Sequence, residues 1–167
     1  DGFLEDITSQ TIFDKCELII INANSPGSEE AKILEYQKKH PNIFYKKLEE
    51  DPGIYGCWNI GIEMSTGDFV SNANLDDRRS SQQLEILAKE LLSNDDIDLV
   101  YSECLITHRE NENYSNNSSS GRICSAADFS AQNMIKCLPG PMPLWRKTMH
   151  DTSGFFNPSY KFAGDWE

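Results

Sequence analysis

The sequence predicts an α/β fold with a mostly parallel sheet. Short runs rich in β-branched residues alternate with longer stretches whose apolar residues recur three and four positions apart, along most of the 167 residues. The first pattern is typical of buried strands and the second of amphipathic helices. Because parallel strands need a long crossover connection, this alternation favours a parallel sheet covered by helices. The apolar fraction of 38% is high enough for such a fold to bury a core.

The first half of the chain is expected to alternate between helix and strand. Helices are predicted over residues 3–10, 28–40 and 54–64, and strands over 17–22, 43–48 and 68–73. The β-branched run in the first of these strands indicates that it is buried. Glu29 and Glu30 favour the start of the second helix through its dipole, and Pro41 ends it.

The second half begins with the clearest helix signal. Leu84, Leu87 and Leu91 recur at helical spacing, and Ser80 with Gln83 is expected to form a capping box at the helix start. Later elements are predicted as a strand over 99–106, a polar surface loop over 109–121, a helix over 128–137 and a short helix over 146–152. The length of the chain suits one domain, so residues 1–167 are interpreted as a single domain.

The charge balance excludes two classes of partner. The chain has 15 Lys and Arg residues against 27 Asp and Glu residues, which gives a net charge of −12. Binding to nucleic acid or to an anionic membrane surface depends on clustered Lys and Arg, which this sequence lacks. No apolar run approaches the roughly 20 residues that span a bilayer, so no transmembrane segment is expected. A ligand with phosphate groups would need a positive mediator.

The cysteines indicate a reducing compartment. Five are present, widely spaced and without a CxxC pair, at Cys16, Cys57, Cys104, Cys124 and Cys137. This pattern argues against a zinc site and against a disulfide framework. A cytoplasmic location is therefore expected.

Two adjacent carboxylates follow the predicted strand over residues 68–73. In an open α/β sheet, ligands bind beyond the carboxyl ends of the strands, where Asp76 and Asp77 are expected to lie. Their negative charges repel each other, and a divalent cation relieves that repulsion. Hard oxygen ligands of this kind suit Mg²⁺ or Mn²⁺. The alternative is that both residues are ordinary turn residues, one of which caps the following helix.

Six segments in chain order resemble the catalytic domain of family 2 inverting glycosyltransferases. They are SQT at 9–11 with ELIIINANS at 17–25, GIYGCWNIGI at 53–62, TGDFV at 66–70 with NLDD at 74–77, DLVY at 98–101, PLWRK at 143–147 with GFF at 154–156, and GDWE at 164–167. One such match alone would be weak. Together they span nearly the whole chain, and the chain is identified as similar to this family.

The resemblance implies a glycosyltransferase-A fold, which is a Rossmann-like three-layer sandwich. It also implies the transfer of a sugar, with inversion, from a nucleotide-diphosphate donor to an acceptor hydroxyl, with Asp165 as the general base. The expected donor is a UDP-sugar, the cofactor Mn²⁺ or Mg²⁺, and the acceptor a glycan or lipid-linked molecule of bacterial polysaccharide synthesis. By the same resemblance, other residues would hold the nucleotide (Asn22, Asn24, Ser25 and Asn59), the metal (Asn74, Asp76 and Asp77), the diphosphate (Arg78), and the sugar or acceptor (Trp145, Trp166 and Glu167).

The sequence departs from the family's pattern at several positions. Amides stand where the family has aspartates, at Asn22, Asn24 and Asn74, and Gly164 replaces the glutamate of a Glu-Asp pair. Compared with the family, the chain lacks the opening strand and the last helix, so it is interpreted as a catalytic domain truncated at both ends. A missing strand would leave a sheet edge unpaired, which would rearrange or pair with a second copy in a dimer.

The sequence leaves two other functions open. The amide replacements fit a catalytically inactive remnant that binds a sugar nucleotide or a protein partner. A sugar-nucleotide pyrophosphorylase-like nucleotidyltransferase would share the nucleotide-binding architecture. Trp145 and Trp166 would either stack on a sugar ring or belong to the core. Arg78 and Arg79 would either reach a diphosphate or pair with acidic neighbours.

Overall fold

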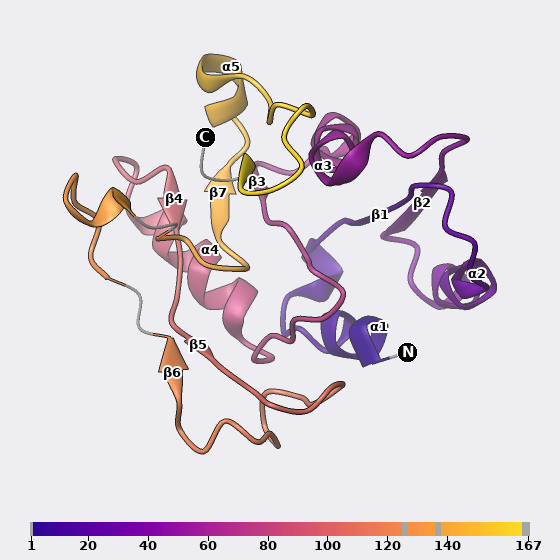
Figure 1. The fold of residues 1–167 in the computed structure, drawn as a ribbon, viewed down its shortest axis with the longest axis horizontal. Coiled ribbons are helices and arrows are strands. Elements are labelled where there is room, and N and C mark those ends of the chain that lie inside the picture. Colours follow the sequence, from indigo (N-terminus) through magenta and orange to yellow (C-terminus); the bar gives the residue numbers. More distant parts are fainter. Residues whose placement is uncertain (1, 125–126, 136–137, 165–167) are drawn as a thin grey trace. The chain divides into compact units, whose positions relative to one another are not determined.

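The computed structural model in Figure 1 describes residues 2–124, 127–135 and 138–164. The chain divides into two compact units. The first unit comprises Asp1–Phe13 and Ser71–Arg146, and the second comprises Asp14–Val70 and Lys147–Glu167. Each unit buries its own set of apolar side chains.

The second unit is built on a β-α-β segment that confirms the predicted order of elements. β1 (Leu18–Asn22) and β2 (Ile43–Lys47) pair in parallel, with each end of one strand opposite the same end of the other. α2 (Glu29–Lys39) connects them and packs on β2 (Figure 1), while α3 (Gly53–Met64) packs on β1. The buried apolar side chains of this unit are Leu18, Ile33, Ile43, Tyr55 and Ile62.

Two short elements complete the second unit. β3 (Phe69–Val70) lies within the strand predicted over residues 68–73 and is shorter than predicted. The N–H of Lys147 donates to the carbonyl of Asp68 at 2.8 Å, which fastens the segment before α5 (Met149–Ser153) beside β3. α5 begins three residues later than the helix predicted over 146–152, and Gly154 follows it with a φ of 78°, a left-handed conformation that glycine adopts without strain.

The first unit joins the N-terminal helix to a helix and an antiparallel strand pair. α1 (Gly2–Thr8) is followed by η1 (Phe13–Lys15), a single 3₁₀ turn that leads into the second unit. α4 (Gln83–Ser93) packs on β4 (Leu99–Val100) and β7 (Leu144–Arg146), which pair antiparallel. The buried apolar residues here include Leu4, Ile7, Leu84, Leu87, Leu91, Val100, Leu138, Met142, Leu144 and Trp145.

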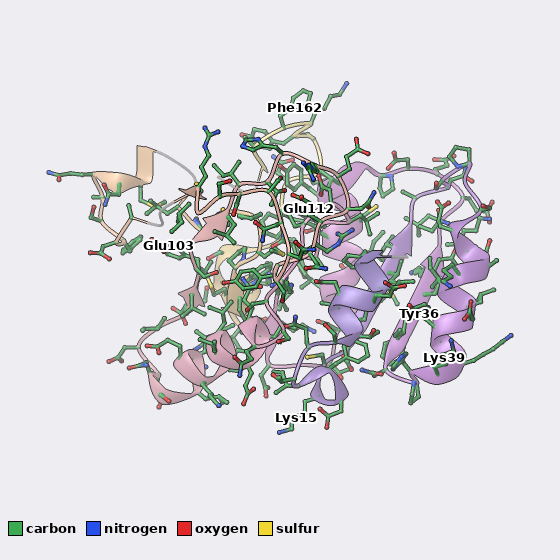
Figure 2. All side chains as sticks on the ribbon, turned by 90° about the horizontal axis from the view of Figure 1, so that it is seen from below. Lys15, Tyr36, Lys39, Glu103, Glu112 and Phe162 are labelled. Atoms are coloured by element: carbon green, nitrogen blue, oxygen red, sulfur yellow. The ribbon has the colours of Figure 1, made fainter. Side chains whose placement is uncertain are left out.

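A polar segment in the first unit is bounded by a second antiparallel pair. β5 (Cys104–Leu105) pairs with β6 (Ile123–Cys124), and the residues between them form the surface loop that the sequence predicts. Glu112, labelled in Figure 2, lies in this loop. Its carboxylate accepts the Ser118 N–H at 2.9 Å and the Ser118 hydroxyl at 2.6 Å, so the loop is held by its own side chains.

Three local predictions for the first unit are wrong. The strand predicted over 99–106 is divided into β4 and β5, because the pairing partner changes from β7 to β6. Over residues 127–135 of the helix predicted at 128–137, the structure contains only the 3₁₀ turn η2 (Asn133–Ile135). α4 begins after Gln82, without a side-chain cap, so Ser80 and Gln83 form no capping box. The Gln83 side chain instead accepts from Arg79 at 2.8 Å and donates to Ser102 at 3.0 Å.

The exposed surface of α2 illustrates where charged residues lie. Glu35 accepts Lys39 at 2.8 Å and Lys32 at 3.2 Å, one turn along the helix in each direction. Lys39 also lies 5.7 Å from the ring centroid of Tyr36, and both are labelled in Figure 2. Within the described residues, no helix combines the length and the apolar content needed to cross a lipid bilayer.

Candidate functional site

The polar loop at the end of β1 carries three predicted nucleotide contacts. Asn22 is the last residue of β1 and is 8% exposed. Its Oδ1 accepts the Ser25 N–H at 2.8 Å, and its Nδ2 donates to the Tyr45 hydroxyl at 2.9 Å. Asn24 has a φ of 60°, a left-handed conformation that asparagine adopts more readily than most residues. Asn22 therefore anchors the turn, and Asn24 and Ser25 are its exposed members.

Asn59, the fourth predicted nucleotide contact, lies on α3 and binds the backbone of a distant segment. Its Nδ2 donates to the Phe156 carbonyl at 2.7 Å, and its Oδ1 accepts the Phe156 N–H at 3.0 Å. The Phe156 ring packs edge-on against Trp58, with centroids 5.3 Å apart. Both polar groups of Asn59 thus hold this segment on α3. The contact joins residues 97 apart in the chain, so no local pattern in the sequence reveals it.

The three predicted metal ligands lie in one turn of the first unit. Nδ2 of Asn74 donates to Oδ2 of Asp77 at 2.8 Å, so these two side chains meet. Oδ1 of Asn74 accepts from Asn72 at 3.3 Å, and the same Asn72 amide donates to the Pro141 carbonyl at 2.7 Å. Asp76 is exposed, whereas Asp77 is half-buried. The turn therefore presents two carboxylates beside an amide, and Asn72 links it to the segment that contains Pro141.

The two arginines after this turn have different environments. Nη1 of Arg78 donates to the backbone carbonyls of Leu75 and Asp77, both at 2.8 Å. Arg79 is only 4% exposed. Its guanidinium donates to three acceptors at 2.7–2.9 Å, namely Ser71 Oγ, the Asn72 carbonyl and Gln83 Oε1. Arg79 therefore serves the fold of this unit, and a diphosphate contact of Arg78 stays a prediction.

Asp6 of α1 also supports the turn, and sequence reasoning missed it. Its Oδ2 accepts the backbone N–H of Arg79 at 2.9 Å. Burial raises the pKa of Asp6, while the Arg79 N–H and the positive charges of Arg78 and Arg79 oppose that rise. Asp6 lies 73 residues before Arg79, and no motif in the sequence connects the two.

The oxygen donors of the turn fit a hard divalent cation. Asp76 and Asp77 offer carboxylates and Asn74 offers an amide oxygen, which are ligands that Mg²⁺ and Mn²⁺ accept. Mg²⁺ in particular is usually held by one or two carboxylates, together with water and substrate phosphates. In the described part of the chain, no three His, Cys, Asp or Glu side chains form a cluster suited to a metal. Two carboxylates and one amide are thus the ligands that this turn can provide.

The residues predicted to contact the sugar or acceptor include Trp145. This residue lies on β7 opposite Leu99 and is 6% exposed. Such burial fits the core alternative, and a sugar contact of Trp145 stays a prediction. The predicted base Asp165 and the predicted contacts Trp166 and Glu167 lie outside the described residues.

The predicted site residues are divided between the two units. The second unit holds the predicted nucleotide contacts, in the loop after β1 and on α3. The first unit holds the predicted metal and diphosphate contacts, in the turn at residues 74–78. Each unit therefore carries one polar loop with exposed amide, hydroxyl or carboxylate groups.

Curated proteins with similar sequences are described as glycosyltransferases or biosynthetic proteins. The chain is 25% identical over 165 residues to the uncharacterized glycosyltransferase YwdF of Bacillus subtilis (strain 168), which covers 98% of this chain and 59% of YwdF. It is 30% identical over 83 residues to the minor teichoic acid biosynthesis protein GgaB of the same organism, covering 49% of this chain and 9% of GgaB. The chain thus spans less than two thirds of either relative.

Two solved structures share the fold. The crystal structure of S. aureus TarS 1–349 in complex with UDP matches with a TM-score of 0.72 at 16% identity, over 98% of this chain and 47% of that chain. The mannosyltransferase PcManGT from Pyrobaculum calidifontis, in complex with GDP-Man and Mn²⁺, matches with a TM-score of 0.64 at 14% identity, over 93% and 43%. The structure therefore has the α/β architecture of glycosyltransferase-A proteins.

The family model for "Glycosyl transferase family 2" matches residues 2–155, which include both polar loops and nearly all helices and strands of the two units. This match covers far more than half of the chain. The chain belongs to glycosyltransferase family 2.

Proposed function

We propose that this chain is part of an enzyme that transfers a sugar from a nucleotide-diphosphate donor to an acceptor hydroxyl, with inversion at the anomeric carbon. The observation that carries the proposal is the family match over residues 2–155. The relative GgaB is described as a protein of teichoic acid biosynthesis. This description supports a glycan or lipid-linked acceptor, and we place the reaction in the cytoplasm.

The donor is a UDP-sugar in this proposal, because the TarS structure that shares the fold is in complex with UDP. Asn24 and Ser25 are exposed at the end of β1, where an α/β sheet binds its ligand. Amide and hydroxyl groups at these positions hydrogen-bond the base and ribose without adding charge. Asn22 and Asn59 complete the proposed contacts, and both are already held in place by protein partners.

Asn74, Asp76 and Asp77 hold Mn²⁺ or Mg²⁺ in this proposal. PcManGT, a neighbour of the same fold, is in complex with Mn²⁺. A bound divalent cation would supply the positive charge that stabilises the diphosphate leaving group. Arg78 directly follows Asp77 in the chain, and its guanidinium is the second positive group proposed to bind the diphosphate. A cation is the means by which a chain of net charge −12 binds a diphosphate.

The chain's own residues move the proton. The carboxylate of Asp165 accepts the proton of the acceptor hydroxyl as that oxygen attacks the anomeric carbon. The bond between the anomeric carbon and the diphosphate oxygen breaks on the opposite face, which inverts the configuration. Gly164, the residue before Asp165, donates its N–H to the Tyr55 hydroxyl at 2.7 Å and is thus fixed to α3. Trp145, Trp166 and Glu167 are the proposed contacts of the sugar and acceptor.

Calorimetry with UDP tests the metal turn. We expect UDP to bind tightly in the presence of Mn²⁺, and removal of Mn²⁺ to weaken binding by roughly tenfold or more. Asp76→Ala should weaken the binding of both Mn²⁺ alone and UDP with Mn²⁺, because it removes an exposed carboxylate of the turn. Mn²⁺ titrated without nucleotide separates loss of the cation from loss of the nucleotide.

Asp95→Ala is the matched control for this experiment. Asp95 is an exposed aspartate of the same unit, in the turn after α4, and its removal changes the net charge equally. Its Mn²⁺ and UDP affinities should equal those of the unchanged chain. Equal UDP affinity with and without Mn²⁺ would contradict the metal's role. The absence of any nucleotide binding would favour an inactive remnant that binds a protein partner.

The role of Asp165 is tested by kinetics. Asp165→Asn should lower the rate of sugar transfer from a UDP-sugar by about 10²–10⁴-fold, because an amide accepts no proton at neutral pH. UDP affinity in the presence of Mn²⁺ should not change. Asp151→Asn, an exposed aspartate on α5, serves as the control and should keep full activity. Full transfer activity of Asp165→Asn would refute the assignment. Release of pyrophosphate when the chain is given UTP and a sugar 1-phosphate would favour the nucleotidyltransferase.

A further inference from the structure

Two cysteines face each other across the antiparallel pair of β5 and β6. Cys104 and Cys124 are direct register partners. The Ile106 N–H donates to the Arg122 carbonyl at 2.9 Å, so residues 106 and 122 form a hydrogen-bonded pair. Because hydrogen-bonded and non-hydrogen-bonded pairs alternate, residues 104 and 124 form the next hydrogen-bonded pair. Such partners have Cα atoms about 5.5 Å apart, within the roughly 4.4–6.8 Å that disulfides span.

The two side chains also meet. Both cysteines are free thiols, Cys104 half-buried and Cys124 exposed. The side chains lie close enough for Cys124 to act on the Cys104 thiol. Burial raises the pKa of Cys104, and the neighbouring Cys124 and the Asp77 carboxylate raise it further. The exposed member of the pair is therefore the one that an oxidant reaches first, and its partner is already beside it.

We propose that Cys104 and Cys124 form a reversible disulfide when the protein meets a low-molecular-weight disulfide. The Cys124 thiolate attacks one sulfur of the small disulfide, and the first small thiolate leaves. The Cys104 thiolate then attacks Sγ of Cys124 in this mixed disulfide, and the second small thiolate leaves. The protein dithiol loses two electrons and two protons, and the small disulfide gains both to become two thiols.

The bridge would act on the part of the first unit that contains the candidate metal turn. It would join two strands of only two residues each, at the ends of the loop between β5 and β6. Cys104 is close enough to Asp77 for the carboxylate charge to act on its thiol. The proposal depends on the geometry of the cysteine pair and not on the proposed sugar transfer.

Mass spectrometry of the oxidised chain tests the bridge. The protein is incubated with excess oxidised glutathione, remaining thiols are blocked with iodoacetamide, and the chain is cleaved with trypsin without reduction. Cleavage after Lys89, Arg109, Arg122 and Lys136 places Cys104 in peptide 90–109 and Cys124 in peptide 123–136, each with a single cysteine. We expect most of the protein to yield these two peptides joined, and dithiothreitol to separate them fully.

Matched variants control for pairing with other thiols. Cys104→Ser should abolish the joined peptides and leave Cys124 attached to glutathione, because the second attack cannot occur. Cys57→Ser, in the second unit, should leave the joined peptides unchanged. Recovery of Cys104 and Cys124 as separate iodoacetamide-blocked peptides after oxidation of the unchanged chain would overturn the proposal. A bridge that joins either cysteine to a different one would overturn it equally.

Discussion

Gly164 occupies a position with no room for a side chain. A Cβ atom at this residue would lie 2.7 Å from Cε2 and 2.9 Å from Cζ of Tyr55. Tyr55 is 5% exposed, and its hydroxyl accepts the Gly164 N–H at 2.7 Å. The ring cannot retreat easily, because it packs edge-on against Trp58 with centroids 5.3 Å apart. A glycine where the family has a glutamate therefore has a steric reason in this chain.

This contact predicts opposite effects for two glycine-to-alanine changes in the second unit. Gly164→Ala should lower the free energy of unfolding by about 1–3 kcal/mol, because the new methyl group overlaps the Tyr55 ring. Gly61→Ala on α3 meets no atom within 4 Å and should raise it by up to about 1 kcal/mol, through better helix propensity. Urea denaturation measures both. A Gly164→Ala protein as stable as the unchanged chain would contradict the packing described for Tyr55.

Neighbouring residues of one type can have unrelated roles, and this limits what the sequence can predict. Arg78 and Arg79 are equivalent in the sequence, and either could have been assigned to a diphosphate. In the structure, Arg79 is 4% exposed and donates to three acceptors of its own unit. Arg78 donates to two carbonyls of the turn that precedes it. The two arginines differ because the side chain of Arg79 is buried and that of Arg78 is not. No local sequence pattern predicts which of the two is buried.

At the scale of elements, Glu17 connects the start of β1 to the end of α3. Its carboxylate accepts the Thr66 N–H at 2.7 Å and also the Thr66 hydroxyl. These hydrogen bonds lower the pKa of Glu17, with the hydroxyl contributing most. A carboxyl group whose pKa is lower in the folded state stabilises the fold above its unfolded pKa. That contribution is lost as the pH falls through the folded pKa.

Glu17→Gln should therefore destabilise the chain in a pH-dependent way. The urea midpoint of the variant should lie below that of the unchanged chain at about pH 7, and the difference should be smaller at about pH 3. Glu63→Gln removes an exposed glutamate from α3 and is the matched control for the change in net charge. The same difference in midpoint at both pH values would mean that the Glu17 charge does not stabilise the junction.

The elements with strong local patterns were predicted well. β1, α2, β2 and α3 lie within one or two residues of their predicted ranges, because β-branched runs and a helix-stopping proline mark their ends. Elements that depend on distant partners were not predicted. β6 is recognisable only through its pairing with β5. The capping box does not form because the Gln83 side chain accepts from Arg79 and donates to Ser102, which lies 19 residues further along the chain.

At the scale of the whole molecule, local sequence patterns identify the family, whereas contacts between distant residues hold the predicted site loops in place. Six motifs in chain order were sufficient to identify the family, which the match over residues 2–155 confirms. The polar loops at residues 22–25 and 74–77 were also recognisable, because each directly follows a predicted strand. The groups that hold them in place, such as Tyr45, Asp6 and the Pro141 carbonyl, come from other parts of the chain. Pattern alone could not have connected them.

The net charge of −12 predicts how salt affects nucleotide binding by the whole chain. Without a divalent cation, the acidic protein repels UDP, and salt screens this repulsion. The Debye length falls from about 30 Å at 0.01 M to about 10 Å at 0.1 M ionic strength. UDP affinity measured without metal should therefore rise over this range. With Mn²⁺ present it should fall, because salt also screens the attraction between the cation and its proposed ligands, the carboxylates of Asp76 and Asp77.

Uridine is the control ligand for this experiment, since it has the same base and ribose but no phosphate charge. Its affinity should change little with ionic strength, with or without Mn²⁺. Calorimetry at the two ionic strengths compares the ligands under identical conditions. A UDP affinity that falls with salt in the absence of metal would mean that fixed positive groups, such as Arg78, attract the diphosphate more strongly than the net negative charge of the chain repels it. In that case the cation would no longer be needed to explain how an acidic chain binds this ligand.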